Sequence, residues 1–102
     1  MAKAIALYNP PADADAFDSY YYGTHVPLAK RMPGLRSYTV SDGPIATPAG
    51  PAPYHLVAVL EFDSMAAIGA ALGSPEGQAV VADLGNFASG GVSVLMFDEK
   101  SI

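Results

Sequence analysis

The stretch Tyr20-Tyr-Tyr-Gly-Thr-His-Val-Pro-Leu-Ala-Lys-Arg-Met-Pro-Gly34 brings together three tyrosines, one of the two histidines and the only Lys-Arg pair. The residues before it have the apolar spacing of an amphipathic helix that begins near Ala14. Pro27 disturbs that helix, because it donates no amide hydrogen and its ring presses on the carbonyl of Gly23. We therefore expect a kink or reset at this point, with His25 beside it and facing a cavity.

The composition fits a single domain over residues 1–102 that hides some apolar surface. Hydrophobic residues make up 51% of the chain and charged residues only 15%, which is a thin polar coat for a small protein. A well-buried monomer is one explanation, and burial of apolar surface against a second copy is the sharper one. We therefore expect a homodimer.

Charge and residue usage exclude several functional classes. The net charge is −5 and no basic cluster exceeds two residues, so we expect no nucleic-acid partner. Cysteine is absent, which excludes disulfides, thiol nucleophiles and thiolate metal sites and fits a cytoplasmic location. The apolar run at the N-terminus is too short for a signal peptide or a membrane span, so we expect no membrane partner.

The pattern of periodicities and turn residues predicts an α+β fold. A strand at 3–8 is followed by a helix from about 14 to 31 that Asp13 can cap, and then by a strand at 36–41. A Pro- and Gly-rich loop fills 42–53 and precedes a strand at 54–62. Helices are expected from 63 or 64 to about 72 and from 74 to about 85, before a last strand at about 91–97. This is the βαββαβ order of a ferredoxin-like antiparallel sheet.

In that topology the first and third strands are central, and both are apolar on their two faces. The helices cover only one face of the sheet, so the other apolar face needs a partner. Two such sheets packed face to face would bury it and close a barrel-like cavity between or within the subunits. We predict a dimeric α/β barrel.

The two histidines are the candidate catalytic residues. His25 lies next to the helix break in apolar surroundings, and a neutral imidazole can accept a proton near physiological pH, so a general base is its natural role. His55 opens the third strand, where it either bonds to the backbone or faces a pocket. The two histidines are thirty residues apart and no carboxylates cluster near them, so the sequence lacks the ligand spacing of a metal site. We therefore expect no metal site.

Tyrosine hydroxyls are the candidate groups for binding a carbonyl or phenol oxygen. Tyr8, Tyr38 and Tyr54 lie on or next to strands, and Tyr20 to Tyr22 lie on the helix. The pattern does not choose among them. We name Tyr8, Tyr22 and Tyr38 as predicted substrate-binding residues.

The chain resembles the EthD family through segments that stand in the family's order and span nearly the whole sequence. These segments are Tyr21–Ala29, Met32–Arg36, Pro53–Val57 leading to Glu61–Ser64, and Ser74–Gln78 leading to Asn86–Gly91. The resemblance implies a dimeric α+β barrel of ferredoxin-like subunits. The family's recurrent histidine corresponds to His25, while His55 and Asn86 fall in other recurrent motifs, so Asn86 joins the predicted substrate-binding residues.

The resemblance implies less about the reaction. Many members have no known activity, similar fungal proteins act as dehydratases or decarboxylases on polyketides, and related dimeric barrels include monooxygenases and isomerases. Our leading hypothesis is a small cofactor-independent enzyme that acts on an apolar or aromatic, oxygen-bearing metabolite, with His25 as acid/base. A tyrosine or His55 would orient a carbonyl or enolate. The alternatives are a non-catalytic ligand-binding or accessory protein of a degradation pathway and a haem protein with His25 as axial ligand.

Overall fold

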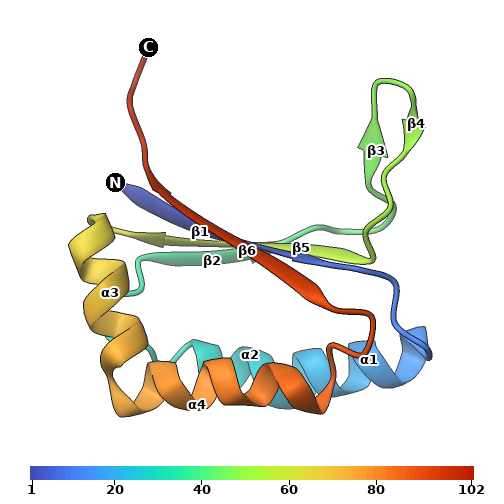
Figure 1. Ribbon diagram of the computed structural model, residues 1–102, viewed down its shortest axis with the longest axis horizontal. Helices are drawn as coiled ribbons and strands as arrows, with labels where there is room; N and C mark the ends of the chain where they lie inside the picture. Colours follow the sequence, from blue (N-terminus) through green and yellow to red (C-terminus); the bar gives the residue numbers. More distant parts are fainter.

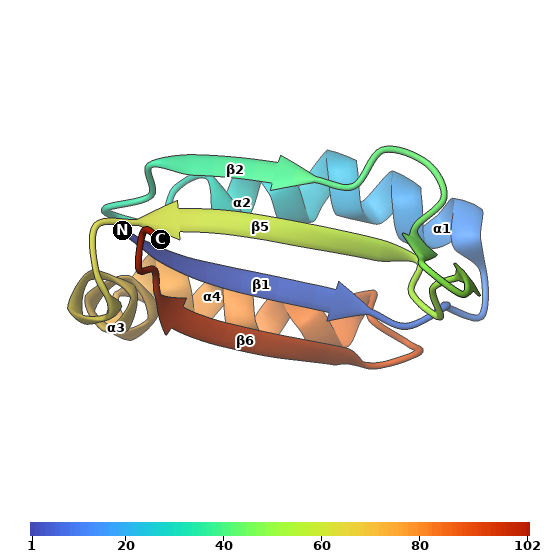
Figure 2. The ribbon, with the colours of Figure 1, turned by 90° about the horizontal axis from the view of Figure 1, so that it is seen from above.

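The computed structural model describes all residues 1–102 and consists of one antiparallel sheet with helices on one face (Figure 1). The sheet is built from β1 (Ala2–Tyr8), β2 (Ser37–Val40), β5 (Leu56–Phe62) and β6 (Val92–Asp98) in the order β2-β5-β1-β6. Figure 2 shows this order, with the helices behind the strands. The predicted α+β, ferredoxin-like arrangement is confirmed, with the first and third long strands at the centre.

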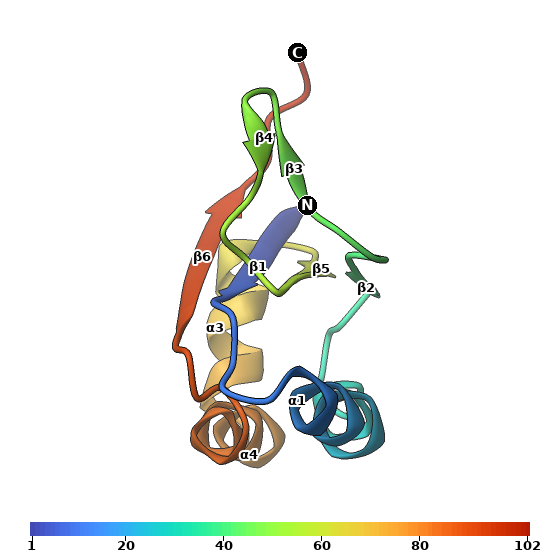
Figure 3. The same ribbon diagram turned by 90° about the vertical axis from the view of Figure 1, so that its right-hand side faces the viewer.

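The helical layer contains α1 (Ala14–Tyr20), a π-helical turn (Tyr21–His25), α2 (Val26–Ala29), α3 (Met65–Gly73) and α4 (Pro75–Asp83), which a 3₁₀ turn at Leu84–Asn86 extends. Seen end-on in Figure 3, α1 and α4 lie side by side beneath the sheet, while α3 rises at one end toward it. No helix has both the length and the apolar character needed to cross a lipid bilayer.

The expected break near Pro27 takes the form of a π-helical turn. The Val26 amide donates to the carbonyl of Tyr21, five residues back, so the helix widens just before Pro27. Such widened turns are a common way for a helix to absorb an irregularity. The helix thus continues through the predicted break without ending.

The π turn keeps a four-residue repeat of side chains on the sheet side. Phe17, Tyr21, His25 and Ala29 are spaced by four and all are at least 97% buried. In a regular α-helix each four-residue step advances the side chain by about 40°, so three steps would rotate the last one by about 120°. Because the π turn has more residues per turn, it offsets part of this rotation. His25 therefore faces the sheet.

Two predicted loop and strand boundaries differ from the structure. The segment 42–53 contains a short hairpin, β3 (Ala46–Thr47) and β4 (Gly50–Pro51), which projects from the face opposite the helices (Figure 1). The third long strand begins at Leu56, two residues later than expected, although the amide of His55 still donates to the carbonyl of Tyr8 at 2.8 Å. The cap expected at Asp13 is present, and the two later helices are capped by Ser64 and Ser74, which agrees with their expected start positions.

Strand alternation divides the sheet into two faces. The buried residues Ala2, Ala6 and Tyr8 of β1 and their partners on β5 face the helices. The residues between them on each strand therefore point away from the helices. These outward residues include Ile5, Leu7, Val57, Val59, Leu95 and Phe97. Leu95 and Phe97 are 53% and 43% exposed, respectively. The helix-free face is thus largely apolar, with one ion-paired cluster of Lys3, Glu61 and Glu99 at its end.

The start of α4 packs closely on the end of α3, and Gly77 makes that approach possible. A Cβ atom at Gly77 would lie 1.9 Å from the carbonyl oxygen of Ala71 and 2.7 Å from the Cα of Leu72. Backbone atoms cannot yield as a flexible side chain can. A side chain at this position would therefore push α4 away from α3 and shift the residues that α4 carries.

We expect Gly77→Ala to lower the free energy of unfolding by about 1–3 kcal/mol, the usual cost of overpacking a tight contact. The matched control is Gly69→Ala, at an exposed position of α3 where a Cβ atom would meet nothing within 4 Å. That change should stabilise the protein by about 0.5–1 kcal/mol, because alanine favours the helix over glycine. Urea denaturation measures both values, and equal stabilities of the two variants would contradict the packing argument.

Candidate functional site

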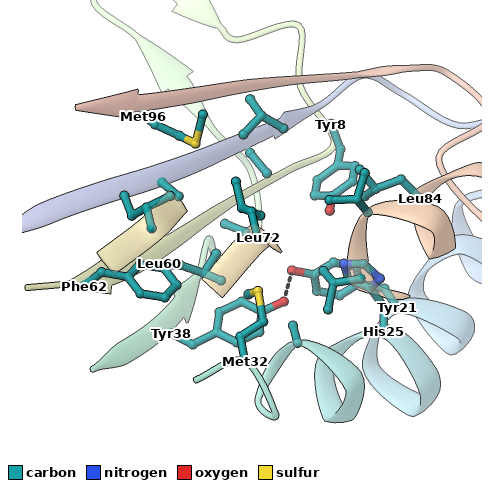
Figure 4. Close-up of a pocket in the computed structure, with 18 residues that line it drawn as sticks. Tyr8, Tyr21, His25, Met32, Tyr38, Leu60, Phe62, Leu72, Leu84 and Met96 are labelled. Atoms are coloured by element: carbon teal, nitrogen blue, oxygen red, sulfur yellow. Dashed lines mark hydrogen bonds between the residues drawn. The ribbon is translucent and has the colours of Figure 1, made fainter. Parts of the chain in front are cut away.

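A cavity lies between the helix-covered face of the sheet and the helices (Figure 4). Its volume is about 90 Å³, and 17 of the 18 residues that line it are hydrophobic, tyrosines included. The exception is His25. No lysine or arginine lines the cavity, so its polar chemistry comes from one imidazole and a few tyrosine hydroxyls.

The imidazole of His25 is held by a carboxylate from the neighbouring helix. Its side chain is 4% exposed, and Nδ1 lies 2.9 Å from Oδ2 of Asp83, the last residue of α4. An ionised carboxylate only accepts hydrogen bonds, so Nδ1 carries the proton that bridges the two groups. In the neutral imidazole, Nε2 then keeps its lone pair. No other hydrogen bond within the chain engages the ring.

Asp83 stays ionised because several donors converge on it. The Tyr20 hydroxyl donates to Oδ1 at 2.5 Å, and the Asn86 side-chain amide donates to the same oxygen at 3.0 Å. Burial on its own raises the pKa of Asp83, but the hydrogen bonds from Tyr20, Asn86 and His25 outweigh it and lower the pKa. The carboxylate is therefore a fixed acceptor that sets the tautomer of His25.

Burial controls the protonation of His25. Desolvation lowers the pKa of His25 below 6.5, although Asp83 acts in the opposite direction by favouring the charged form. The imidazole is therefore neutral at physiological pH. A neutral imidazole with a free Nε2 can accept a proton from a bound molecule.

Three tyrosines bring hydroxyl groups to the same cavity. The hydroxyls of Tyr21 and Tyr38 lie 2.5 Å apart and bond to each other, as the dashed line in Figure 4 shows. The Tyr8 hydroxyl makes no hydrogen bond within the chain, although the residue is only 2% exposed. Burial is the main reason that the pKa values of Tyr8, Tyr21 and Tyr38 are raised. All three remain protonated donors at neutral pH.

The cavity opens beside the edge strand β6. Among its lining residues, Val81, Val94 and Met96 are 53%, 49% and 42% exposed, respectively. Val81 lies on α4, and the other two lie on the helix-facing side of β6. These flexible or small apolar side chains mark the entrance, whereas Tyr8, Tyr21 and His25 line the interior.

The sequence matches a known protein family. The model of the EthD domain matches residues 9–91. An uncharacterized 11.0 kDa protein of Rhodococcus erythropolis, from the thcB–thcC intergenic region, is 41% identical over 102 residues, covering 100% of this chain and 98% of that protein. The chain belongs to the EthD family.

Solved structures agree with this assignment. An ethyl tert-butyl ether D (EthD) family protein of Bacillus halodurans is 33% identical, with a TM-score of 0.88 over 98% of this chain and 99% of the other. A dimeric ferredoxin-like protein of unknown function from Thermobifida fusca is 16% identical, with a TM-score of 0.68 over 94% and 88%. SnoaB, a cofactor-independent oxygenase from Streptomyces nogalater, is 16% identical, with a TM-score of 0.66 over 99% and 94%. The last two likenesses concern the fold.

The structure brings three of the predicted site residues of this EthD protein into one cavity, namely His25, Tyr8 and Tyr38. Asn86 does not line the cavity but donates a hydrogen bond to Asp83, the partner of His25. Tyr22 is 50% exposed and lies in a different surface hollow, beside His55. Sequence reasoning missed Asp83, which is 58 residues from His25 in the chain and carries no motif of its own.

His55 forms a second His–Asp pair outside the cavity. Its Nε2 lies 2.8 Å from Oδ1 of Asp18, and its ring packs edge-on against Phe17 at 4.8 Å between ring centroids. The side chains of His55 and Asp18 are 23% and 47% exposed, so the pair is open to solvent. The predicted catalytic role of His55 stays a prediction, and this geometry separates it from His25.

Larger prosthetic groups do not fit this cavity. A volume of about 90 Å³ is far smaller than the space that a porphyrin ring needs. The haem alternative therefore has no support in this geometry. No group of three or more potential metal-ligating side chains lies close enough together to hold a metal ion.

The burial of His25 gives the protein a defined response to pH. Because its pKa in the folded state lies below the value of about 6.5 in an unfolded chain, the unfolded chain binds more protons below that pH. The contribution of His25 to stability is therefore fully present above about pH 6.5 and is lost as the pH falls toward the folded-state pKa.

We expect an NMR titration of the His25 ring protons to give a pKa below 6.5. Asp83→Asn should lower this pKa further, because it removes the charge that favours the imidazolium. Asp18→Asn is the matched control, since it removes the carboxylate of the other His–Asp pair and should leave the His25 titration unchanged. A pKa at or above 6.5 for His25 would contradict this account.

Proposed function

We propose that this EthD protein is a small cofactor-independent enzyme that acts on an apolar or aromatic, oxygen-bearing metabolite, with His25 as the acid/base. The observation that carries the proposal is a buried neutral imidazole whose Nδ1 is anchored at 2.9 Å to Asp83 and whose Nε2 has no partner in the chain. A general base requires such a free, oriented nitrogen.

The cavity supports an apolar substrate. Its lining removes water from the substrate, and the lack of a lysine or arginine leaves no partner for a carboxylate or phosphate group. The volume of about 90 Å³ lies below the ~300 Å³ at the lower end of typical ligand pockets, so this conformation favours a small ligand or a small part of one. Isomerase, dehydratase and cofactor-independent oxygenase chemistry each use a base such as His25 to remove a proton from the substrate. In a decarboxylase, loss of CO₂ leaves an electron pair on carbon, and a protonated His25 would supply the proton that it takes up.

The alternative is a non-catalytic protein that binds such a metabolite or supports a degradation pathway. The nearly uniform apolar lining favours this alternative, because binding alone needs little beyond buried area. A thermal-shift screen that finds ligands, followed by product analysis that finds no conversion, would select it over the enzyme.

We expect His25→Gln to reduce turnover by about 10² to 10⁴-fold on any converted member of a panel of phenolic and polyketide-like compounds, because it removes the proton acceptor. Circular dichroism and thermal unfolding confirm that the variant folds. His55→Gln, assayed beside it, tests the role predicted for the second histidine. Unchanged turnover in His25→Gln would remove His25 from the mechanism.

We also propose that a second copy of the chain covers the helix-free face of the sheet. This face exposes Leu95 and Phe97 beside the half-buried Ile5, Val57 and Val59, a contiguous apolar surface of the kind that marks interfaces. The description of a fold neighbour as dimeric supports this arrangement.

We expect Leu95→Glu to convert a dimer into a monomer, because it buries a charge within the proposed contact. Light scattering coupled to size-exclusion chromatography measures the mass. The matched control is Val81→Glu, an exposed apolar residue on α4 in the helical layer on the other side of the sheet, which should leave the dimer intact. A monomeric wild-type protein at micromolar concentration would contradict the proposal.

A further inference from the structure

The Tyr8 hydroxyl is a buried polar group that the chain itself leaves unused. The residue is 2% exposed and the hydroxyl has no hydrogen-bond partner in the chain, yet no polar side-chain atom in the structure is both fully buried and unpartnered. The oxygen therefore borders the open space of the cavity, where Figure 4 shows it pointing inward on the same side as Tyr21 and His25. A ligand oxygen in that space would give the hydroxyl the hydrogen-bond partner that the chain does not supply.

Packing fixes this hydroxyl in direction. The Tyr8 ring contacts Phe17, Tyr21 and Phe87 with centroid separations of 5.4, 5.6 and 5.6 Å. An aromatic ring held on several sides cannot swing its hydroxyl to another partner. The donor is therefore already oriented before a ligand binds.

The Tyr21–Tyr38 pair supplies a second donor. In a bond between two hydroxyls, one oxygen accepts, and the proton of that accepting hydroxyl stays available. Since no third group of the chain engages either oxygen, this proton also serves the cavity. Two tyrosyl donors and the free Nε2 of His25 thus share one end of the cavity, whereas the other end is apolar, around Phe62, Leu72 and Met96 (Figure 4).

We propose that Tyr8 binds the oxygen of a neutral carbonyl compound with an acidic C–H bond beside the carbonyl, and that it stabilises the enolate formed when His25 removes that proton. The inference rests on the proposed role of His25 as a base. The apolar body of the compound lies toward Phe62 and Met96, and its carbonyl faces the tyrosines.

The step balances without a further reactant. The C–H bond breaks as its proton moves to Nε2 of His25, its electron pair forms a C=C bond, and the carbonyl π pair moves to the oxygen. Tyr8 donates to that oxygen, with the Tyr21–Tyr38 pair as second donor. Because no cation lines the cavity, these hydroxyls are the groups that stabilise the charge. Return of the proton to the same or another carbon regenerates the imidazole.

The binding experiment uses 4-fluorophenol, whose hydroxyl-bearing ring resembles an enolate, and fluorobenzene, which lacks the oxygen. Fluorine NMR titrations compare the wild-type protein with Tyr8→Phe, which keeps the packed ring. We expect Tyr8→Phe to bind 4-fluorophenol about 10-fold more weakly, the loss of one hydrogen bond, and to bind fluorobenzene equally well. Equal weakening for both ligands would mean a packing defect and would overturn the assignment of Tyr8.

The kinetic experiment follows exchange of the methyl protons of acetophenone for deuterium in D₂O by proton NMR. We expect the wild-type protein to catalyse exchange, Tyr8→Phe to slow it by about 10²–10³-fold, and His25→Gln to abolish it. Tyr38→Phe should slow exchange less than Tyr8→Phe, because Tyr21 still offers a hydroxyl.

The outcomes separate this inference from the function on which it rests. Exchange that depends on His25 but not on Tyr8 would overturn the role of Tyr8 and leave the base in place. Exchange that neither substitution alters would overturn both. Saturable binding of 4-fluorophenol without any exchange in the wild-type protein would overturn the enolisation step and favour the binding protein.

Discussion

The structure depends on how one helix accommodates Pro27, which has no amide hydrogen to donate. A straight α-helix would rotate its inward stripe away from the sheet over the three four-residue steps from Phe17 to Ala29. The π turn at Tyr21–His25 widens the helix just before the proline and keeps the four-residue repeat pointing inward. The proline and the π turn before it thus direct the imidazole of His25 toward the cavity and not toward solvent.

The placement of His25 becomes chemically useful only through the opposite helix. Asp83 ends α4, and its carboxylate reaches across to Nδ1 while Tyr20 and Asn86 hold its other oxygen. Burial and the carboxylate pull the pKa of His25 in opposite directions, and burial prevails. The outcome is a neutral ring with one defined tautomer, which a solvent-exposed histidine would not have. The second pair, His55 with Asp18, has similar distances but lies open to water and outside the cavity.

The fold could be predicted from the sequence because local signals agree with it. Strand alternation, the caps at Asp13, Ser64 and Ser74, and the proline break all act over a few residues. The hairpin β3–β4 was missed, since prolines and glycines in 42–53 are typical of a loop as well as of a tight turn.

The site was predictable only in part, for a physical reason. The nearby Pro27 pointed to His25 as a site residue. Asp83 reaches His25 only because two helices pack together, and no sequence pattern predicts that contact. The choice among the tyrosines also depends on tertiary structure. The hydroxyls of Tyr21 and Tyr38 bond to each other, whereas the hydroxyl of Tyr8 has no partner in the chain. The sequence, with its six tyrosines, does not show which hydroxyls are paired.

The edge strand β6 links the cavity to the helix-free face. Its alternate residues Val94 and Met96 line the entrance, while Leu95 and Phe97 point to the opposite side of the sheet. A second copy on the helix-free face would bury one set of side chains and fix the strand that carries the other set. The shape of the entrance would then depend on assembly, although the two surfaces share no side chain. Because the alternation has a period of two, each surface can still be altered without touching the residues of the other.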